Sequence, residues 1–94
     1  FFFAGLWEPE TAAAPASFVI VTTAPNDLLQ PIHERMPVIF GPNSGPAWLG
    51  AEPLPPARLA QLCRPLPAGM MSGWKVDPRV NNVRYEAADC IAPV

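Results

Sequence analysis

A chain of 94 residues with 14 prolines can form at most one small domain, and its helices must be short because proline interrupts them. Half of the residues are apolar, which excludes wholesale disorder, and a net charge of -2 excludes a general attraction to nucleic acid or acidic lipid. Any site for a polyanion must therefore be a local cluster of basic residues.

The N-terminal run Phe-Phe-Phe-Ala-Gly-Leu-Trp, residues 1–7, is expected to form a buried strand, in which Gly5 permits a bulge or the close approach of another backbone. The run is too short to cross a bilayer and no basic region precedes it, so it predicts neither a membrane anchor nor a signal peptide. Natural chains seldom begin inside a core strand, and we therefore expect this sequence to be a piece of a longer protein.

The clearest predicted strand covers residues 17–23, which are rich in β-branched and aromatic side chains. A turn follows, in which Asn26 or Asp27 can cap a short helix over residues 28–32. The next strand is expected to run over residues 36–40, because Met-Pro-Val-Ile-Phe is apolar and the residue before a proline prefers extended geometry.

Prolines are expected to set the helix starts in the second half of the chain. Pro46 is expected to open one short helix, and Pro56 a second one whose apolar face includes Leu59 and Leu62. Residues 70–76 are predicted to form a fourth strand. A tight loop at 80–84 and a short extended segment around 90–91 complete the expected elements.

The two cysteines, Cys63 and Cys90, are isolated in the sequence and have no second histidine to complete a metal-ligand set. A zinc site is therefore not expected, and neither is any other cofactor. We expect both cysteines to be buried thiols of a protein from a reducing compartment, in preference to a disulfide.

The joint between the predicted short helix and the 36–40 strand carries the residues best suited to chemistry. His33 is the only histidine, and histidine is the side chain whose ordinary pKa lies nearest physiological pH. Arg35 presents a planar fork that fits phosphate or carboxylate. On residue types alone, purely structural roles for both residues stay open. A lone histidine is more often a structural hydrogen-bond partner, and Arg35 could be a solvated charge.

Six segments of the chain follow one another in an order that is informative about its family. They are Phe-Ala-Gly-Leu-Trp-Glu at 3–8, Ser-Phe-Val-Ile-Val-Thr-Thr-Ala-Pro-Asn at 17–26, Ile-His-Glu-Arg-Met-Pro-Val-Ile at 32–39, Ala-Trp-Leu at 47–49, Val-Asn-Asn-Val-Arg at 80–84 and Cys-Ile-Ala-Pro at 90–93. In this order they resemble the C-terminal half of the SOS-response-associated peptidase (SRAP) domain family. The resemblance covers essentially the whole chain and is weakest in its proline-rich middle.

The resemblance implies an α+β fold, rich in β-structure, with a barrel-like mixed sheet and short flanking helices. Residues 1–94 would be the C-terminal portion of a single SRAP domain whose N-terminal half lies outside this chain. The partners implied are single-stranded DNA with abasic sites and that missing half, with no membrane partner. The complete protein is expected to be a monomer in the bacterial cytoplasm, associated with the nucleoid during repair.

The function that the resemblance implies is abasic-site processing in the DNA damage (SOS) response. Members of the family crosslink to abasic sites in single-stranded DNA through an N-terminal cysteine. The α-amine of this cysteine condenses with the sugar aldehyde and its thiol closes a thiazolidine. The same group is associated with autopeptidase activity. This chain lacks that cysteine and the family's catalytic asparagine and glutamate, so the chain alone is expected not to crosslink DNA, and whether it is an enzyme stays open.

Carried over residue by residue, the resemblance makes His33 the catalytic histidine, which shuttles protons during sugar opening and imine formation. It makes Arg35 a DNA-contacting arginine and Thr22 a DNA-contacting threonine, although an exposed strand-end hydroxyl explains Thr22 equally well. Arg84 could join a phosphate patch or be an ordinary surface arginine. Neighbouring Asn81 and Asn82 are interpreted as turn formers.

Three further residues are not assigned to the site. Trp7 and Trp48 could stack on bases, but both lie in apolar runs and are expected in the core. Glu8 does not lie in the motif that carries the family's catalytic glutamate.

Two alternatives remain open. One is a noncatalytic nucleic-acid-binding or structural remnant of the same fold. The other, with less support, is a hydrolase that pairs Ser72 or Ser44 with His33.

Overall fold

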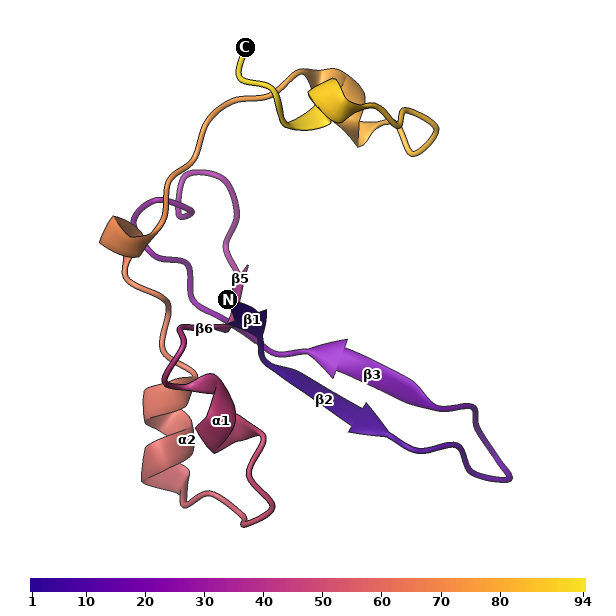
Figure 1. Ribbon diagram of the computed structural model, residues 1–94, viewed down its shortest axis with the longest axis vertical. Coiled ribbons are helices and arrows are strands. Elements are labelled where there is room, and N and C mark those ends of the chain that lie inside the picture. The colour runs from indigo at the N-terminus through magenta and orange to yellow at the C-terminus, as the bar shows by residue number, and fades with distance from the viewer.

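The computed structural model describes residues 1–94, in which six very short strands precede all the helical elements (Figure 1). The strands are β1 Phe2–Phe3, β2 Gly5–Glu8, β3 Ser17–Ile20, β4 Thr22–Thr23, β5 Met36–Pro37 and β6 Ile39–Phe40. The α-helices are α1 Gly45–Trp48 and α2 Pro56–Leu62, followed by the 3-10 turns η1 Ala68–Met70, η2 Pro78–Asn81 and η3 Ala88–Ile91. The architecture is a mixture of α and β elements, as expected.

Each predicted strand of the first half is in fact a pair of short strands separated by one residue. Ala4 separates β1 from β2, Val21 separates β3 from β4, and Val38 separates β5 from β6. The two halves of each pair then join different neighbours, so that β1 pairs with β6, β2 with β3 and β4 with β5, all antiparallel. Three two-stranded sheets therefore diverge from one point.

A closed ring of three backbone hydrogen bonds forms that point. Val21 N–H donates to the Ala4 carbonyl, Val38 N–H donates to the Val21 carbonyl, and Ala4 N–H donates to the Val38 carbonyl, each at 2.9 Å. Ala4 and Val38 are completely buried. We call these three residues the three-strand junction.

The expected barrel-like sheet is not confirmed, because the six strands do not close into a barrel. The physical reason lies at the three-strand junction, where each strand leaves one partner and takes another after a single residue. The sheets consequently point away from one another, and the β2–β3 hairpin projects from the body (Figure 1).

A small core packs beside the junction. Its buried members are Ala4, Val38, Phe40 and Leu62, and partly buried apolar residues that include Trp48 surround them. The Phe40 and Trp48 rings lie 5.4 Å apart, and Trp48 Nε1 donates to the Gly5 carbonyl at 3.1 Å. These contacts hold α1 against β2 and place Trp48 against the core, as predicted.

Both helices begin where the prolines predicted. Pro46 lies in the first turn of α1 and Pro56 is the first residue of α2, positions where the missing N–H of proline costs nothing. Gly45 is buried, and a Cβ at this position would lie 3.4 Å from the Phe2 ring.

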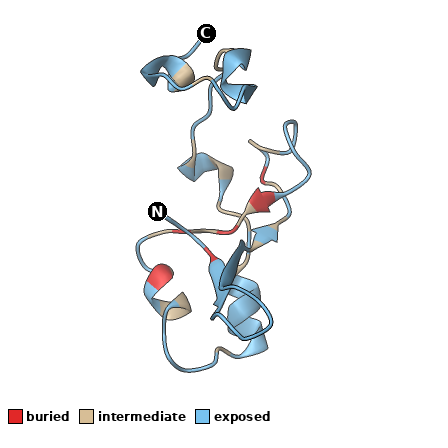
Figure 2. Ribbon diagram, turned by 90° about the vertical axis from the view of Figure 1, so that its right-hand side faces the viewer, coloured by how far each residue is buried: buried red, intermediate tan, exposed pale blue.

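The N-terminal strand is not buried, which corrects the prediction for residues 1–7 and for Trp7. The Trp7 side chain is 73% exposed, and every residue of the β2–β3 hairpin is exposed (Figure 2). The hairpin is paired along its backbone, and Trp48 of α1 donates to its Gly5 carbonyl, but its side chains stay exposed.

Three other predicted elements differ from the structure. Residues 28–32 form hydrogen-bonded turns with no helix, and Pro31 lies within them. Met70 ends η1, and residues 71–76 form no strand, apart from an isolated bridge between Val76 and Pro93. The 90–91 segment is the end of η3 and is not extended.

The C-terminal segment, residues 74–94, folds back on itself. Val94 N–H donates to the Lys75 carbonyl at 3.0 Å, and Trp74 Nε1 donates to the Ile91 carbonyl at 2.8 Å. In both overall views this segment lies apart from the sheets (Figures 1 and 2). The 80–84 loop prediction is confirmed, because η2 and a turn occupy it.

The cysteines and the helix lengths complete the description. Cys63 and Cys90 are free thiols, as expected, but both are partly exposed instead of buried. None of the helices has both the length and the apolar character that a membrane span needs.

The exposed apolar side chains predict that the 94-residue chain self-associates in water, because contiguous apolar surface is stabilised by mutual burial. Replacing Trp7 and Phe18, which are 73% and 74% exposed, together by Ser should shift the chain towards monomer in size-exclusion chromatography with light scattering. Val83→Ser is the matched control, since Val83 is 99% exposed but lies in the C-terminal segment. A monodisperse 10.1 kDa monomer of the unmodified chain would contradict this prediction.

Candidate functional site

Thr22 and Arg35 meet at one end of the β4–β5 pair. Thr22 is opposite Pro37 in the antiparallel register, so residue 35 is a diagonal neighbour of Thr22 on the same face. Arg35 Nε donates to Thr22 Oγ1 at 3.2 Å, and Arg35 Nη2 donates to the Thr22 carbonyl at 2.9 Å. Both residues are exposed. The guanidinium is therefore fixed by two hydrogen bonds at an accessible surface.

His33 is held by the main chain of Arg35. The Arg35 N–H lies 2.9 Å from His33 Nδ1, and the Arg35 carbonyl oxygen lies 3.0 Å from the same nitrogen. Nδ1 accepts from the N–H in one tautomer and donates to the carbonyl in the other. In either case Nδ1 is occupied, while Nε2 of this exposed ring makes no hydrogen bond within the chain. His33 can therefore exchange a proton with a bound molecule through Nε2.

Asn26 builds the loop that carries His33. Its Oδ1 accepts from Leu29 N–H at 3.1 Å, and its Nδ2 donates to the Leu66 carbonyl at 2.8 Å. The loop continues with His33 N–H donating to the Leu29 carbonyl at 3.0 Å. The predicted capping contact at Asn26 is thus confirmed without the helix, and its link to Leu66 was not predicted.

Two methionine sulfurs complete the surroundings of Asn26. Its backbone N–H donates to Met36 Sδ at 3.3 Å, and its Nδ2 also lies 3.3 Å from Met71 Sδ. Met36 is 1% exposed and Asn26 is 9% exposed. Because every polar atom of the buried Asn26 side chain has a partner, the base of the His33 loop is tied both to β5 and to the 66–71 segment. An asparagine in a turn gives no sequence signal for such distant partners.

Arg84 does not join this group. It lies in the C-terminal segment, where its N–H donates to Asn82 Oδ1 at 3.0 Å, and no hydrogen bond or ion pair connects it to His33, Arg35 or Thr22. Asn82 does act within a turn, as interpreted, and Asn81 ends η2.

No other arrangement of reactive side chains is present. Ser72 and Ser44 form no hydrogen bond with His33, whose ring bonds only to the Arg35 main chain, so the Ser–His hydrolase alternative gains no support. Glu8 ends β2 as an exposed residue opposite Ser17. No three His, Cys, Asp or Glu side chains come together as metal ligands would.

A charged cluster that the sequence did not predict lies in the C-terminal segment. Arg79 pairs with Asp77 at 3.0 Å and with Asp89 at 3.6 Å, and its guanidinium lies 5.0 Å from the centre of the Tyr85 ring. The Arg79 backbone N–H that donates to Asp77 holds the pKa of that carboxyl below its usual range. The Asp77 carboxylate raises the pKa of Arg79 in turn. These charges satisfy one another, so Arg79 is not a free cation for a ligand.

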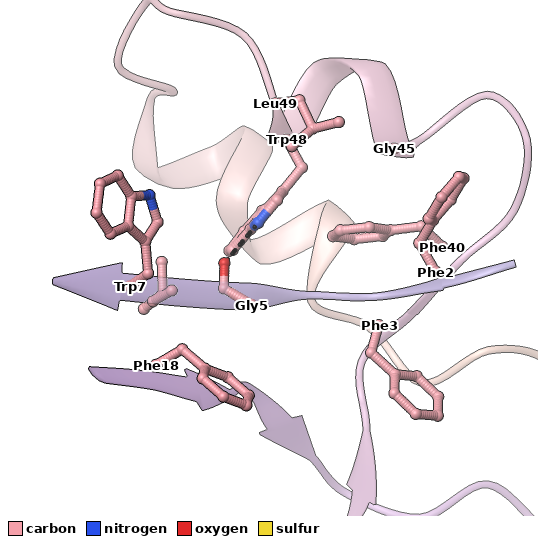
Figure 3. A pocket seen from close by; sticks show the side chains of 10 residues that line it. Phe2, Phe3, Gly5, Trp7, Phe18, Phe40, Gly45, Trp48 and Leu49 are labelled. Carbon is pink, nitrogen blue, oxygen red and sulfur yellow. Dashed lines mark hydrogen bonds between the residues drawn. The ribbon is translucent and has the colours of Figure 1, made fainter. Parts of the chain in front are cut away.

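An apolar hollow of about 280 Å³ lies between β1, β2, β3 and α1 (Figure 3). Aromatic residues from these four elements and from β6 line it, namely Phe2, Phe3, Trp7, Phe18, Phe40 and Trp48. The close view shows the Trp48 indole bonded to the Gly5 carbonyl at its edge. The hollow contains no ionisable side chain, so it can bury apolar groups but offers no acid–base chemistry.

Comparisons with known proteins agree on one family. The SOS response associated peptidase (SRAP) family matches residues 1–83. The abasic site processing protein YoqW of Bacillus subtilis (strain 168) is 33% identical over 94 residues, which cover 97% of this chain and 42% of that protein. The abasic site processing protein YoaM of the same organism is 32% identical over 94 residues, covering 97% of this chain and 41% of that protein.

A vertebrate protein shows the same similarity. The abasic site processing protein HMCES of Gallus gallus is 30% identical over 90 residues, which cover 94% of this chain and 26% of that protein. The chain thus spans less than half of the length of these curated relatives. No solved structure matches it.

Tyr85 provides a pH-dependent prediction for the C-terminal segment. Its hydroxyl donates to Asp89 Oδ1 at 2.6 Å, and this hydrogen bond raises the pKa of the Tyr85 phenol above its ordinary value of about 10. Since the folded state favours the neutral phenol, its contribution to stability is complete below about pH 10 and is lost as the pH rises through the raised value.

The measurement is an alkaline titration followed by the ultraviolet absorbance of tyrosinate, which reports on Tyr85 alone because the chain has one tyrosine. Asp89→Asn should move the transition to lower pH. Asp27→Asn, at an exposed carboxylate without a hydrogen bond, should leave it in place. A transition unaffected by Asp89→Asn would disprove the role of this hydrogen bond.

Proposed function

This chain belongs to the SOS response associated peptidase (SRAP) family, and on that premise we propose that it takes part in processing abasic sites in single-stranded DNA as a response to DNA damage. The observation that carries the proposal is the exposed group of His33, Arg35 and Thr22 at the end of the β4–β5 pair. The curated relatives are named abasic site processing proteins, which supports the abasic site as the substrate. His33 supplies proton transfer and Arg35 supplies binding.

Arg35 is the residue proposed to contact the DNA backbone. The net charge of -2 gives the chain no general attraction to a polyanion, so binding must depend on local cations. A guanidinium that is already fixed at an exposed strand end suits a phosphate, because its planar fork matches two phosphate oxygens. Arg84 lies in the separate C-terminal segment and would contribute, at most, a second backbone contact.

The reaction proposed for the complete protein is covalent capture of the abasic sugar. The closed sugar opens to an aldehyde when its ring oxygen gains a proton and its anomeric hydroxyl loses one. The α-amine of an N-terminal cysteine adds to this aldehyde and water leaves, which gives an imine. The cysteine thiol then adds across the carbon–nitrogen double bond and closes a thiazolidine. No oxidant or reductant is required.

His33 is proposed to move the protons of this sequence. Its Nε2 is free and exposed, whereas Nδ1 is kept in place by the Arg35 main chain. The imidazolium can protonate the sugar ring oxygen through Nε2, and the neutral ring can later accept a proton there. One nitrogen therefore serves both steps, while the other fixes the orientation of the ring.

The cysteine nucleophile would come from polypeptide outside these residues. We propose that residues 1–94 are the C-terminal portion of a single SRAP domain, and that the remainder of the domain covers the exposed apolar side chains around β1, β2 and β3. The completed domain would act as a monomer, with an autopeptidase activity of the same nucleophile. The two Bacillus subtilis relatives agree with a bacterial protein, for which the proposed place is the cytoplasm, on the nucleoid during repair.

The test uses the complete reading frame and single-stranded DNA with one abasic site, analysed on a denaturing gel. The unmodified protein should give a shifted band that survives heating. His33→Ala should form that band roughly 100-fold more slowly, because proton transfer by a positioned side chain is worth at least that factor. The thermal transition should persist, since His33 is exposed.

Arg64→Ala is the control, because Arg64 is an exposed arginine without a hydrogen bond or ion pair. An unchanged rate in His33→Ala would overturn the proposed role of His33. No shifted band from a protein with an intact N-terminal cysteine would favour the alternative, a noncatalytic nucleic-acid-binding or structural remnant.

A further inference from the structure

We infer that Thr22 acts in DNA binding as a positioning residue, which holds the Arg35 guanidinium ready for a phosphate. This inference rests on the proposed function and assigns Thr22 a different part in it from direct contact. The observation behind it is that both oxygens of Thr22, the hydroxyl and the carbonyl, already accept hydrogen bonds from Arg35.

The two hydrogen bonds occupy one edge of the guanidinium. Nε uses its only N–H on Thr22 Oγ1, and Nη2 uses one of its two N–H groups on the Thr22 carbonyl. Of the five donors of an arginine, three remain, two on Nη1 and one on Nη2. One N–H of Nη1 and the free N–H of Nη2 point the same way at the end of the fork, and this pair can bind two phosphate oxygens at once.

Positioning of this kind should increase affinity without adding a contact. An unrestrained arginine loses side-chain freedom when it binds, and that loss opposes binding. Arg35 has already lost this freedom, because its side chain is tied to β4 while its backbone leads directly into β5. Thr22 can hold it because the strand pairing fixes Thr22 opposite Pro37.

The neighbouring threonine makes the arrangement testable. Thr23 lies in the same strand, opposite Met36, and its hydroxyl forms no hydrogen bond. Thr22→Val and Thr23→Val remove the same atom and keep nearly the same shape. They differ in whether the lost hydroxyl had held Arg35.

The experiment measures binding of the protein from the complete reading frame to a fluorescent, unmodified single-stranded oligonucleotide at low salt. Thr22→Val should weaken binding about three- to tenfold, while Thr22→Ser, which keeps the hydroxyl, and Thr23→Val should bind as the unmodified protein does. In the Arg35→Ala background, Thr22→Val should have no further effect, because a positioning residue acts only through its partner.

A second readout does not depend on DNA. Exchange of the Arg35 Nε proton, followed by nitrogen-15 NMR, should be faster in Thr22→Val than in the unmodified protein and unchanged in Thr23→Val. If Thr22→Val weakens binding equally with and without Arg35, Thr22 contacts DNA directly and the inference is wrong. Equal binding by Thr22→Val and the unmodified protein, or no binding by either, also overturns it. The proposed function is tested separately, by the covalent band on the denaturing gel.

Discussion

The ring of hydrogen bonds among Ala4, Val21 and Val38 is the constraint on which the rest of the structure depends. Each of these residues gives its N–H to one neighbouring strand and its carbonyl to the other, so no strand can shift without breaking two bonds. Register matters in such short strands, because a slip by one residue would turn every side chain to the opposite face. Burial of Ala4 and Val38 removes competing water from the ring.

The candidate site depends on this ring through short stretches of chain. Thr22 directly follows Val21, and the β4–β5 register, which Val38 ends, brings Arg35 to its side. Asn26 lies in the loop between them and ties this loop to Leu66 and Met71 through its side-chain amide. A rigid junction and a buried amide thus hold an otherwise exposed histidine and arginine, in a chain whose buried core is small.

Local chemistry explains which features could be predicted from the sequence. Prolines marked the helix starts, and the proline after Met36 marked the joint at which His33 and Arg35 lie. The strand breaks were not predictable, because Ala4 and Val38 carry no local signal, and the glycine that suggested a bulge, Gly5, lies one residue beyond the break. Exposure of Trp7 and separation of Arg84 depend on the tertiary arrangement, which apolar character and motif order do not specify.

The most direct test of this account is amide hydrogen exchange at Ala4, Val21 and Val38 in the protein from the complete reading frame. A ring predicts that the three amides exchange at one slow, common rate, and that Val38→Ala speeds all three together, because the cavity it leaves loosens a shared unit. The control Val83→Ala, at a 99% exposed side chain, should change none of them. Three unrelated rates, or an effect of Val38→Ala confined to residue 38, would contradict the account.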